Sequence, residues 1–342
     1  MYIVRYDNPD PDFPFWRQSP SGSCIWGDFK FVFNQEIEEC DYWVVEDALL
    51  HPTKCRCPPQ HTLFITREPA SIRWYNPFFL RQFHSVMTFQ SKVIHRNVIR
   101  GQPALPWYVG MRWDGERRRW KEDCPLDYDK LKALSDPKKD RLVSVITSDK
   151  TMTKGHRERL AFVRRLEKEF GNDLDVFITS NNGLEDKWDA IGRYRYHITI
   201  ENGVFPDYWS EKMADPLLGL CHPIYHGCPN ISDYFPEGSF TPFDFRKFDS
   251  ALETIRETVY SDARERGLPA LHEAKRMVMD EYNPFPTLVK TLSGLPRGSE
   301  KRDMVLRPEA KVYSRSWRER SKGLVGVLRN ELANWMNGPG LS

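Results

Sequence analysis

The stretch from Tyr194 to Gly227 gathers residues that suit the binding of an anion and of sugar hydroxyl groups. Its apolar start predicts a buried strand over Tyr196 to Ile200, which would deliver Glu201 and Asn202 to the carboxyl end of the strand. In open α/β sheets these ends line the ligand crevice. A carboxylate in that place suits the hydroxyl groups of ribose or of a hexose.

A helix is predicted from Ser210 to Leu218, with Ser210 as its N-cap and with Glu211 and Lys212 in its first turn. Free N–H groups at a helix N-terminus, next to a lysine, form a site for an anion such as a diphosphate. Taken alone, these three residues are explained more simply as a good helix start with a solvated ion pair.

A β-α-β unit is predicted earlier in the chain, with strands at Leu142 to Thr147 and Leu174 to Ile178 and a helix from His156 to Phe170. Arg157 and Arg159 stand in the first turn of this predicted helix and indicate a second site for an anion. The loop from Ser148 to Gly155 has one glycine and matches neither the dinucleotide fingerprint nor a P-loop, which argues against both classes.

The chain has 342 residues, enough for two domains of ordinary size, and 40% of them are hydrophobic. The 50 basic and 48 acidic residues nearly cancel, so the charge does not favour a nucleic-acid partner. Neither a membrane-spanning run nor a signal peptide is visible, and we expect a cytoplasmic protein. The seven cysteines are scattered and odd in number, which predicts reduced thiols and no structural metal.

The predicted organisation is a first domain over residues 1–140 that includes a polar linker, a second domain over 141–300 and a basic tail over 301–342. In the tail, Leu324 to Met336 predicts an amphipathic helix. Two interpretations stay open: the helix docks on its own protein, or it lies on an anionic membrane surface as a peripheral contact. The predicted strands of the first domain are Tyr2–Tyr6, Tyr42–Val45, Leu63–Thr66 and Val86–Phe89.

The motifs around the predicted anion site resemble the C-terminal donor-binding motif of glycosyltransferase family 10, the α1,3/4-fucosyltransferases. Three departures are visible: Arg195 stands for the usual Lys, Gly203 for the usual Ser, and Asp149 for the usual Asn. The matching elements are Tyr194-Arg195-Tyr196, Glu201-Asn202, Asp207-Tyr208-Trp209-Ser210-Glu211-Lys212 and Pro223-Ile224-Tyr225-His226-Gly227.

The resemblance implies an α/β fold of GT-B architecture, in which two Rossmann-like domains face each other across a cleft. It implies inverting transfer of L-fucose from GDP-fucose, without a metal or other cofactor, to a hydroxyl of a glycan that contains GlcNAc or glucose. A different GDP-sugar donor stays open, and a nucleic-acid-binding protein is the distant alternative. The residues implied to bind the donor are Arg159, Arg195, Tyr196, Asn202, Tyr208, Ser210, Glu211 and Lys212.

Inversion needs a carboxylate that accepts the proton of the acceptor hydroxyl. The family takes this glutamate from the end of a strand in its first domain, and Glu68 stands in the corresponding place after Leu63 to Thr66. Without the resemblance, Glu68 would be interpreted as a solvated turn carboxylate. Glu46 and Asp47, which end another predicted strand, are the reserve candidates.

Overall fold

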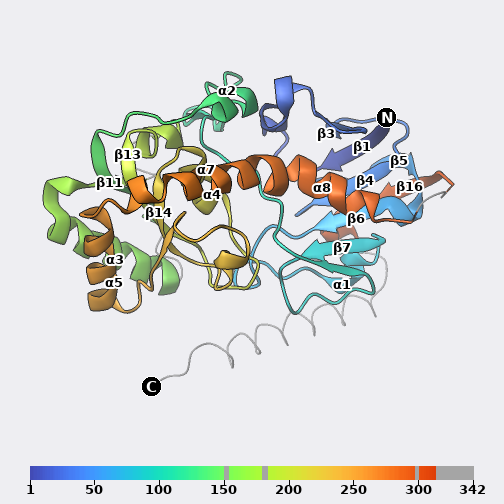
Figure 1. The fold of residues 1–342 in the computed structure, drawn as a ribbon. Coiled ribbons are helices and arrows are strands. Elements are labelled where there is room, and N and C mark those ends of the chain that lie inside the picture. Colours follow the sequence, from blue (N-terminus) through green and yellow to red (C-terminus); the bar gives the residue numbers. More distant parts are fainter. Residues whose placement is uncertain (150–153, 179–183, 297–299, 313–342) are drawn as a thin grey trace. The chain divides into compact units, whose positions relative to one another are not determined.

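The computed structural model describes residues 1–149, 154–178, 184–296 and 300–312, and the chain forms two compact units (Figure 1). Unit 1 comprises residues 1–11, 25–103 and 289–342, and unit 2 comprises residues 12–24 and 104–288. Residues 104–140, predicted as part of the first domain, therefore lie in unit 2. Residues 289–300, predicted as part of the second domain, lie in unit 1.

Unit 1 is built on a sheet with the strand order β2-β3-β1-β4-β6-β7-β8. All neighbouring strands run parallel except β2, which pairs antiparallel with β3. Large aromatic side chains, among them Trp43 and Phe64 of the sheet, belong to the buried hydrophobic core of this unit. The strands are β1 (Tyr2–Asp7), β2 (Ile25–Trp26), β3 (Phe29–Phe33), β4 (Tyr42–Glu46), β6 (Thr62–Ile65), β7 (Ser85–Thr88) and β8 (Val98–Arg100).

The start of the predicted basic tail is part of unit 1. β16 (Arg302–Leu306) pairs antiparallel with β5 (Thr53–Cys57), and the short helix α9 (Glu309–Val312) follows it. The other described α-helix that lies wholly in this unit is α1, which covers Pro77–Leu80. The amphipathic helix predicted for residues 324–336, with its membrane contact, lies outside the described residues.

Unit 2 contains a parallel sheet with the strand order β12-β11-β13-β14-β15. The predicted β-α-β unit is confirmed, because β11, α3 and β12 follow one another and the two strands pair in parallel. The strands are β11 (Arg141–Thr147), β12 (Leu174–Ile178), β13 (Tyr194–Ile200), β14 (His222–His226) and β15 (Thr241–Pro242). The helices are α2 (Tyr128–Ala133), α3 (Lys154–Phe170), α4 (Glu211–Leu218), α5 (Phe248–Val259), α6 (Ala263–Arg266) and α7 (Leu268–Met277).

Helices α3 and α5 pack on the sheet of unit 2, as their apolar spacing requires. Leu166 of α3 and Ile255 of α5 share a buried cluster with Val143 and Ile198 of the sheet. The predicted polar linker is not a bare connection, because it forms the hairpin β9–β10 (Trp113–Asp114 and Arg119–Trp120) and α2. Helix α8 (Pro284–Ser293) runs from the end of unit 2 into unit 1.

The parallel strands of both sheets have a doubly wound order. In unit 1, β3 lies on one side of β1 and the later strands lie on the other. In unit 2, β12 lies on one side of β11 and the later strands lie on the other. These two sheets confirm the predicted α/β class. A doubly wound sheet is also what each Rossmann-like domain of the predicted GT-B architecture contains. In such folds ligands bind where the strand order reverses, beyond the carboxyl ends of the strands. For unit 2 that place lies at the ends of β11 and β13. Within the described residues, no helix combines the length and the apolar character needed to cross a bilayer.

Candidate functional site

The centre of the site in unit 2 is the contact between Glu201 and Ser210. Glu201 directly follows β13, and its carboxylate accepts hydrogen bonds from the Ser210 backbone N–H (2.8 Å) and from the Ser210 hydroxyl (2.8 Å to Oε2). Ser210 is the N-cap of α4, and its hydroxyl oxygen accepts a hydrogen bond from the N–H of Lys212 at 3.3 Å. This buried contact ties the helix N-terminus to the end of the strand.

Two features of the local chain hold this contact in place. Gly227 leaves no room for a side chain, because a Cβ atom there would lie 2.5 Å from Cγ of Glu201. Asp207 takes a left-handed conformation (φ 61°) in the turn that leads to Ser210. The side chains of Asn230 and Tyr234 both donate hydrogen bonds to its carboxylate, at 2.9 and 2.8 Å. These contacts explain why the motif residues occur together.

In the first turn of α4, the carboxylate of Glu211 lies between two ammonium groups, those of Lys187 and Lys212. Glu211 Oε1 lies 3.2 Å from Lys187 Nζ and 3.1 Å from Lys212 Nζ. Burial alone would raise the pKa of Glu211, but the two ammonium groups hold that pKa well below its ordinary value. Burial raises the pKa of the Glu201 carboxyl, and the charge of Lys212, 3.8 Å away, opposes that rise.

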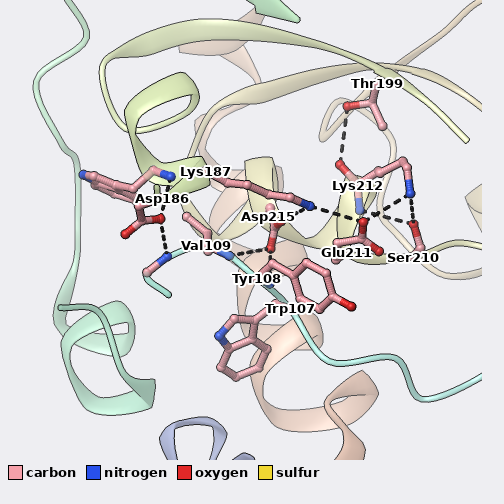
Figure 2. A network of polar contacts seen from close by, with 12 residues as sticks. Trp107, Tyr108, Val109, Asp186, Lys187, Thr199, Ser210, Glu211, Lys212 and Asp215 are labelled. Atoms are coloured by element: carbon pink, nitrogen blue, oxygen red, sulfur yellow. Dashed lines mark hydrogen bonds and ion pairs between the residues drawn. The ribbon is translucent and has the colours of Figure 1, made fainter. Parts of the chain in front are cut away.

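Asp215, one turn further along α4, joins these charged groups to the segment before the hairpin (Figure 2). Its Oδ2 lies 3.1 Å from Lys187 Nζ, and its Oδ1 accepts hydrogen bonds from the backbone N–H groups of Tyr108 (2.8 Å) and Val109 (3.0 Å). The ammonium of Lys187 also lies 4.8 Å from the ring centre of Tyr108. Asp186 binds the same segment through the N–H of Gly110 at 2.8 Å. These contacts explain why residues 104–140 belong to unit 2.

Arg159 of α3 connects the ends of the two strands at the point where the strand order reverses. One Nη donates a hydrogen bond to Asn202 Oδ1 (3.1 Å), beyond β13, and the other to Ser148 Oγ (3.0 Å), beyond β11. Its Nε is buried and has no hydrogen-bond partner among the described residues. Burial lowers the pKa of the guanidinium and the charge of Glu201 opposes this, so Arg159 and Lys212 both interact with that carboxylate.

The structure therefore brings together five of the predicted donor residues at the end of β13. Asn202 is exposed and Lys212 is partly exposed, whereas Arg159 and Ser210 are buried. The predicted start of α3 is two residues late, since the helix begins at Lys154 and Arg159 lies in its second turn. The five residues are Arg159, Asn202, Ser210, Glu211 and Lys212.

Three other predicted donor residues have different surroundings. Arg195 and Tyr196 lie at the start of β13, roughly 17–20 Å along the strand from Glu201. Arg195 pairs with Glu265 at 2.6 Å, and the Tyr196 hydroxyl donates to the carbonyl of Ser261 at 2.9 Å. Tyr208 is 3% exposed, in the turn before α4. The structure thus places Arg195 and Tyr196 apart from the group at the strand end.

The predicted base and its reserves follow strands of unit 1. Glu68 is half-buried, and its backbone N–H donates to the hydroxyl of Tyr75 at 3.1 Å. Asp47 is engaged by Arg73 and Tyr75, both at 2.5 Å, and Glu46 is wholly buried. Of the three carboxylates, Glu68 is the most accessible, and its role stays a prediction.

Sequence reasoning missed Lys187 and Asp215. A signal was present, because Glu211 and Asp215 stand four residues apart on one face of a helix, where like charges repel. The spacing therefore predicts that a cation lies between the two carboxylates and offsets their repulsion. The sequence does not say which one, because Lys187 comes from a separate turn, η5 (Lys187–Ala190). In the part of the chain that is described, no three His, Cys, Asp or Glu side chains are grouped to hold a metal ion.

Residues 136–264 match the model of a protein family described as "Glycosyltransferase family 10 (fucosyltransferase) C-term". The matched range contains β11 to β14, the helices α3 and α4, and the group at the end of β13. This part of the chain is similar to glycosyltransferase family 10. The resemblance predicted from the motifs is thereby confirmed for this part of the chain.

Named relatives match shorter segments. "Alpha-(1,3)-fucosyltransferase B" of Drosophila melanogaster is 35% identical over 69 residues, which cover 20% of this chain and 16% of the fly protein. "Alpha-(1,3)-fucosyltransferase FucT" of Helicobacter pylori is 28% identical over 79 residues, 23% of this chain and 16% of the bacterial protein. "GDP-fucose protein O-fucosyltransferase 3" of Xenopus laevis is 32% identical over 66 residues, 19% of this chain and 14% of the frog protein. The chain thus aligns with a small part of each relative.

A solved structure described as α1,3-fucosyltransferase with GDP-fucose aligns with 88% of this chain and 93% of its own, at 18% sequence identity and a TM-score of 0.49. At that level of likeness we base the fold class on the strand order of the two sheets and not on the superposition.

Proposed function

We propose that the chain is a glycosyltransferase that moves L-fucose from GDP-fucose to a hydroxyl group of a glycan containing GlcNAc or glucose, as an α1,3-fucosyltransferase does. One observation carries the proposal: the segment that matches the fucosyltransferase family also contains the residues of the predicted anion site, which lie at the switch point of unit 2. The names of the fly and Helicobacter relatives support fucose as the sugar. The name of the Xenopus relative supports GDP-fucose as the donor.

The diphosphate of the donor is proposed to bind between Lys212 and Arg159. The positive end of the helix dipole at the start of α4 favours negative charge near Lys212. The ammonium of Lys212 is partly exposed, and Arg159 holds a guanidinium N–H without a partner among the described residues. These cations would stabilise the charge that builds up on the departing GDP.

Asn202 and Glu211 are proposed to contact hydroxyl groups of the donor. The amide of Asn202 is exposed and is oriented by Arg159 through its oxygen, which leaves its NH₂ group directed away from that bond. Glu211 stays ionised because two lysines surround it, so it remains an acceptor of hydrogen bonds at neutral pH. Tyr208 is proposed to shape the pocket from the turn before α4.

The reaction is proposed to invert the anomeric carbon. The acceptor oxygen forms a bond to that carbon while the bond to the phosphate oxygen of GDP breaks, and GDP leaves with the electron pair. Glu68 would accept the proton of the acceptor hydroxyl. Metal independence is part of the proposal, with Lys212 and Arg159 supplying the positive charge; transfer should then continue at full rate in excess EDTA.

A second acceptor class is favoured by one comparison. The Xenopus relative is named as a protein O-fucosyltransferase, so a hydroxyl group on a protein is the alternative to a glycan hydroxyl. The donor site proposed above is the same for both acceptors, because it lies in the matched segment.

The experiment is a transfer assay with labelled GDP-fucose and two sets of acceptors, oligosaccharides ending in N-acetyllactosamine or lactose and folded protein domains that carry serine and threonine. Labelled oligosaccharide with an inverted anomeric centre supports the first proposal, and labelled protein supports the second. GDP-mannose is the matched control donor. No transfer to either set, or faster transfer from GDP-mannose, would contradict the proposed function.

A further inference from the structure

Unit 2 has a pocket of about 300 Å³ between α2 and the end of α7, and its lining contains none of the residues of the proposed donor site. This volume is at the lower end of the range for small-molecule sites. Its apolar lining includes Leu134 and Met279. The polar and charged side chains that line it are Lys132, Ser135, His272, Lys275, Arg276 and Asp280.

Most of the charge in this lining is already neutralised. Lys132 Nζ lies 3.2 Å from both carboxylate oxygens of Asp280. Arg276 pairs with Glu273 at 2.7 Å and with Glu281 at 2.6 Å. Lys132 and Arg276 thus have carboxylate partners, and the remaining lysine of the lining is Lys275.

Lys275 is 5% exposed, and its ammonium donates a hydrogen bond to the carbonyl of Leu134 at the end of α2. Within the described ranges, no carboxylate lies at ion-pair distance from this ammonium. Burial lowers the pKa of Lys275 to about 8, with no nearby charge to oppose the shift. A buried ammonium with two remaining N–H donors and no counter-charge is costly, unless an anion takes up those donors.

We propose that this pocket binds a small oxyanion, a phosphate or carboxylate group carried by a small molecule, with Lys275 as its anchor. The ammonium of Lys275 would donate charge-assisted hydrogen bonds to the anion, and the Ser135 hydroxyl and Lys132 would contact it from the rim. Leu134 and Met279 would pack against the apolar part of the ligand. This site is separate from the donor site and does not depend on the proposed function.

The test measures the binding of inorganic phosphate and of acetate at constant ionic strength, in excess GDP so that a diphosphate site is filled. We compare the full chain with Lys275→Met and with Lys130→Met. Lys130 is the matched control, because it lies on α2, which borders the pocket, but donates to the carbonyl of Pro125 at 3.0 Å and does not line the pocket. The two variants lose the same charge.

The proposal predicts that Lys275→Met weakens binding of the preferred anion by about tenfold or more, whereas Lys130→Met leaves it unchanged. Tighter binding of phosphate identifies a phosphate ligand, and tighter binding of acetate a carboxylate. Absence of binding to the wild-type chain, or equal binding by both variants, would overturn the proposal.

A second measurement keeps the test valid if Lys275→Met fails to fold. The wild-type chain is treated with an amine-acylating reagent at pH 8, and the labelled lysines are identified by mass spectrometry. Lys139 is the internal control, because burial also lowers its pKa to about 8, but its ammonium already donates to three carbonyls. Phosphate or acetate should slow labelling of Lys275 severalfold and leave that of Lys139 unchanged. Equal rates with and without the anion would contradict the site.

Discussion

Lys187 and Lys212 contact the same oxygen of Glu211, and replacing each with methionine separates a lysine that supports the fold from a lysine that binds the donor. The two substitutions remove the same charge from the same network and keep a similar apolar side chain. The surroundings of the lysines differ in how closely each approaches a second carboxylate: Lys187 lies 3.1 Å from Asp215, whereas Lys212 lies 3.8 Å from Glu201.

Lys187→Met leaves the buried carboxylate of Asp215 without its cation. Breaking a buried pair in this way costs about 3–5 kcal/mol of folding free energy. For a unit of this size the loss corresponds to a fall in melting temperature of roughly 6–20 °C. Lys212→Met leaves Glu211 paired with Lys187. Glu201 loses a longer contact of 3.8 Å but keeps the hydrogen bonds from Ser210, so the expected loss of stability is smaller, about 1 kcal/mol.

For GDP binding, we expect the larger effect from Lys212→Met and the smaller effect from Lys187→Met. Loss of a charge-assisted hydrogen bond to the diphosphate is worth about 1.5–3 kcal/mol, so Lys212→Met should raise the Kd for GDP roughly 10- to 100-fold. Lys187→Met, measured below its melting temperature, should leave the Kd nearly unchanged. Calorimetric titration with GDP and thermal unfolding of the three proteins provide both quantities. Unchanged GDP affinity in Lys212→Met, or unchanged stability in Lys187→Met, would refute the reasoning.

Three further predictions concern other parts of the chain. Glu68→Gln should keep GDP affinity and lower the transfer rate by ~100-fold or more, and an active variant would return the search to Glu46 and Asp47. Arg195→Met should leave GDP affinity unchanged, because Arg195 pairs with Glu265 far from the strand end; a weaker titration would place the donor elsewhere. The lowered pKa of Glu211 stabilises the fold above its unfolded-state pKa of 4.5, and this contribution is lost as pH falls toward the folded-state pKa. Urea unfolding of Glu211→Gln should therefore differ most from wild type at neutral pH and converge with it in acid, and a constant difference would speak against the two-lysine environment.

The parts of unit 2 that sequence predicts well are those whose structure depends on local patterns. The apolar run at Leu142–Thr147 matches β11, and the serine before Glu211 is the N-cap of α4. In the same way, β13 delivers Glu201 to the strand end, as its pattern predicts. These features depend on side-chain periodicity and capping, which neighbouring residues determine.

The remaining features depend on contacts between distant segments. The hairpin and α2 within residues 113–141 have little apolar periodicity, and the segment just before them is held by Asp186 and Asp215. The sequence did not predict β16, because this strand lies in a basic stretch and pairs with only one of the described strands, β5, which is distant in the sequence. The chain also breaks between α5 and α6, after Val259, where the Ser261 carbonyl accepts a hydrogen bond from the Tyr196 hydroxyl of β13.

The central claim is that GDP binds at the end of β13 between Lys212 and Arg159. A crystal structure of the protein with GDP tests this claim most directly. We expect diphosphate oxygens at roughly 2.7–3.2 Å from Lys212 Nζ and from the Arg159 guanidinium, with the nucleotide beyond the carboxyl ends of β11 and β13. A diphosphate bound anywhere else in unit 2, with these two side chains still in contact only with protein, would contradict it.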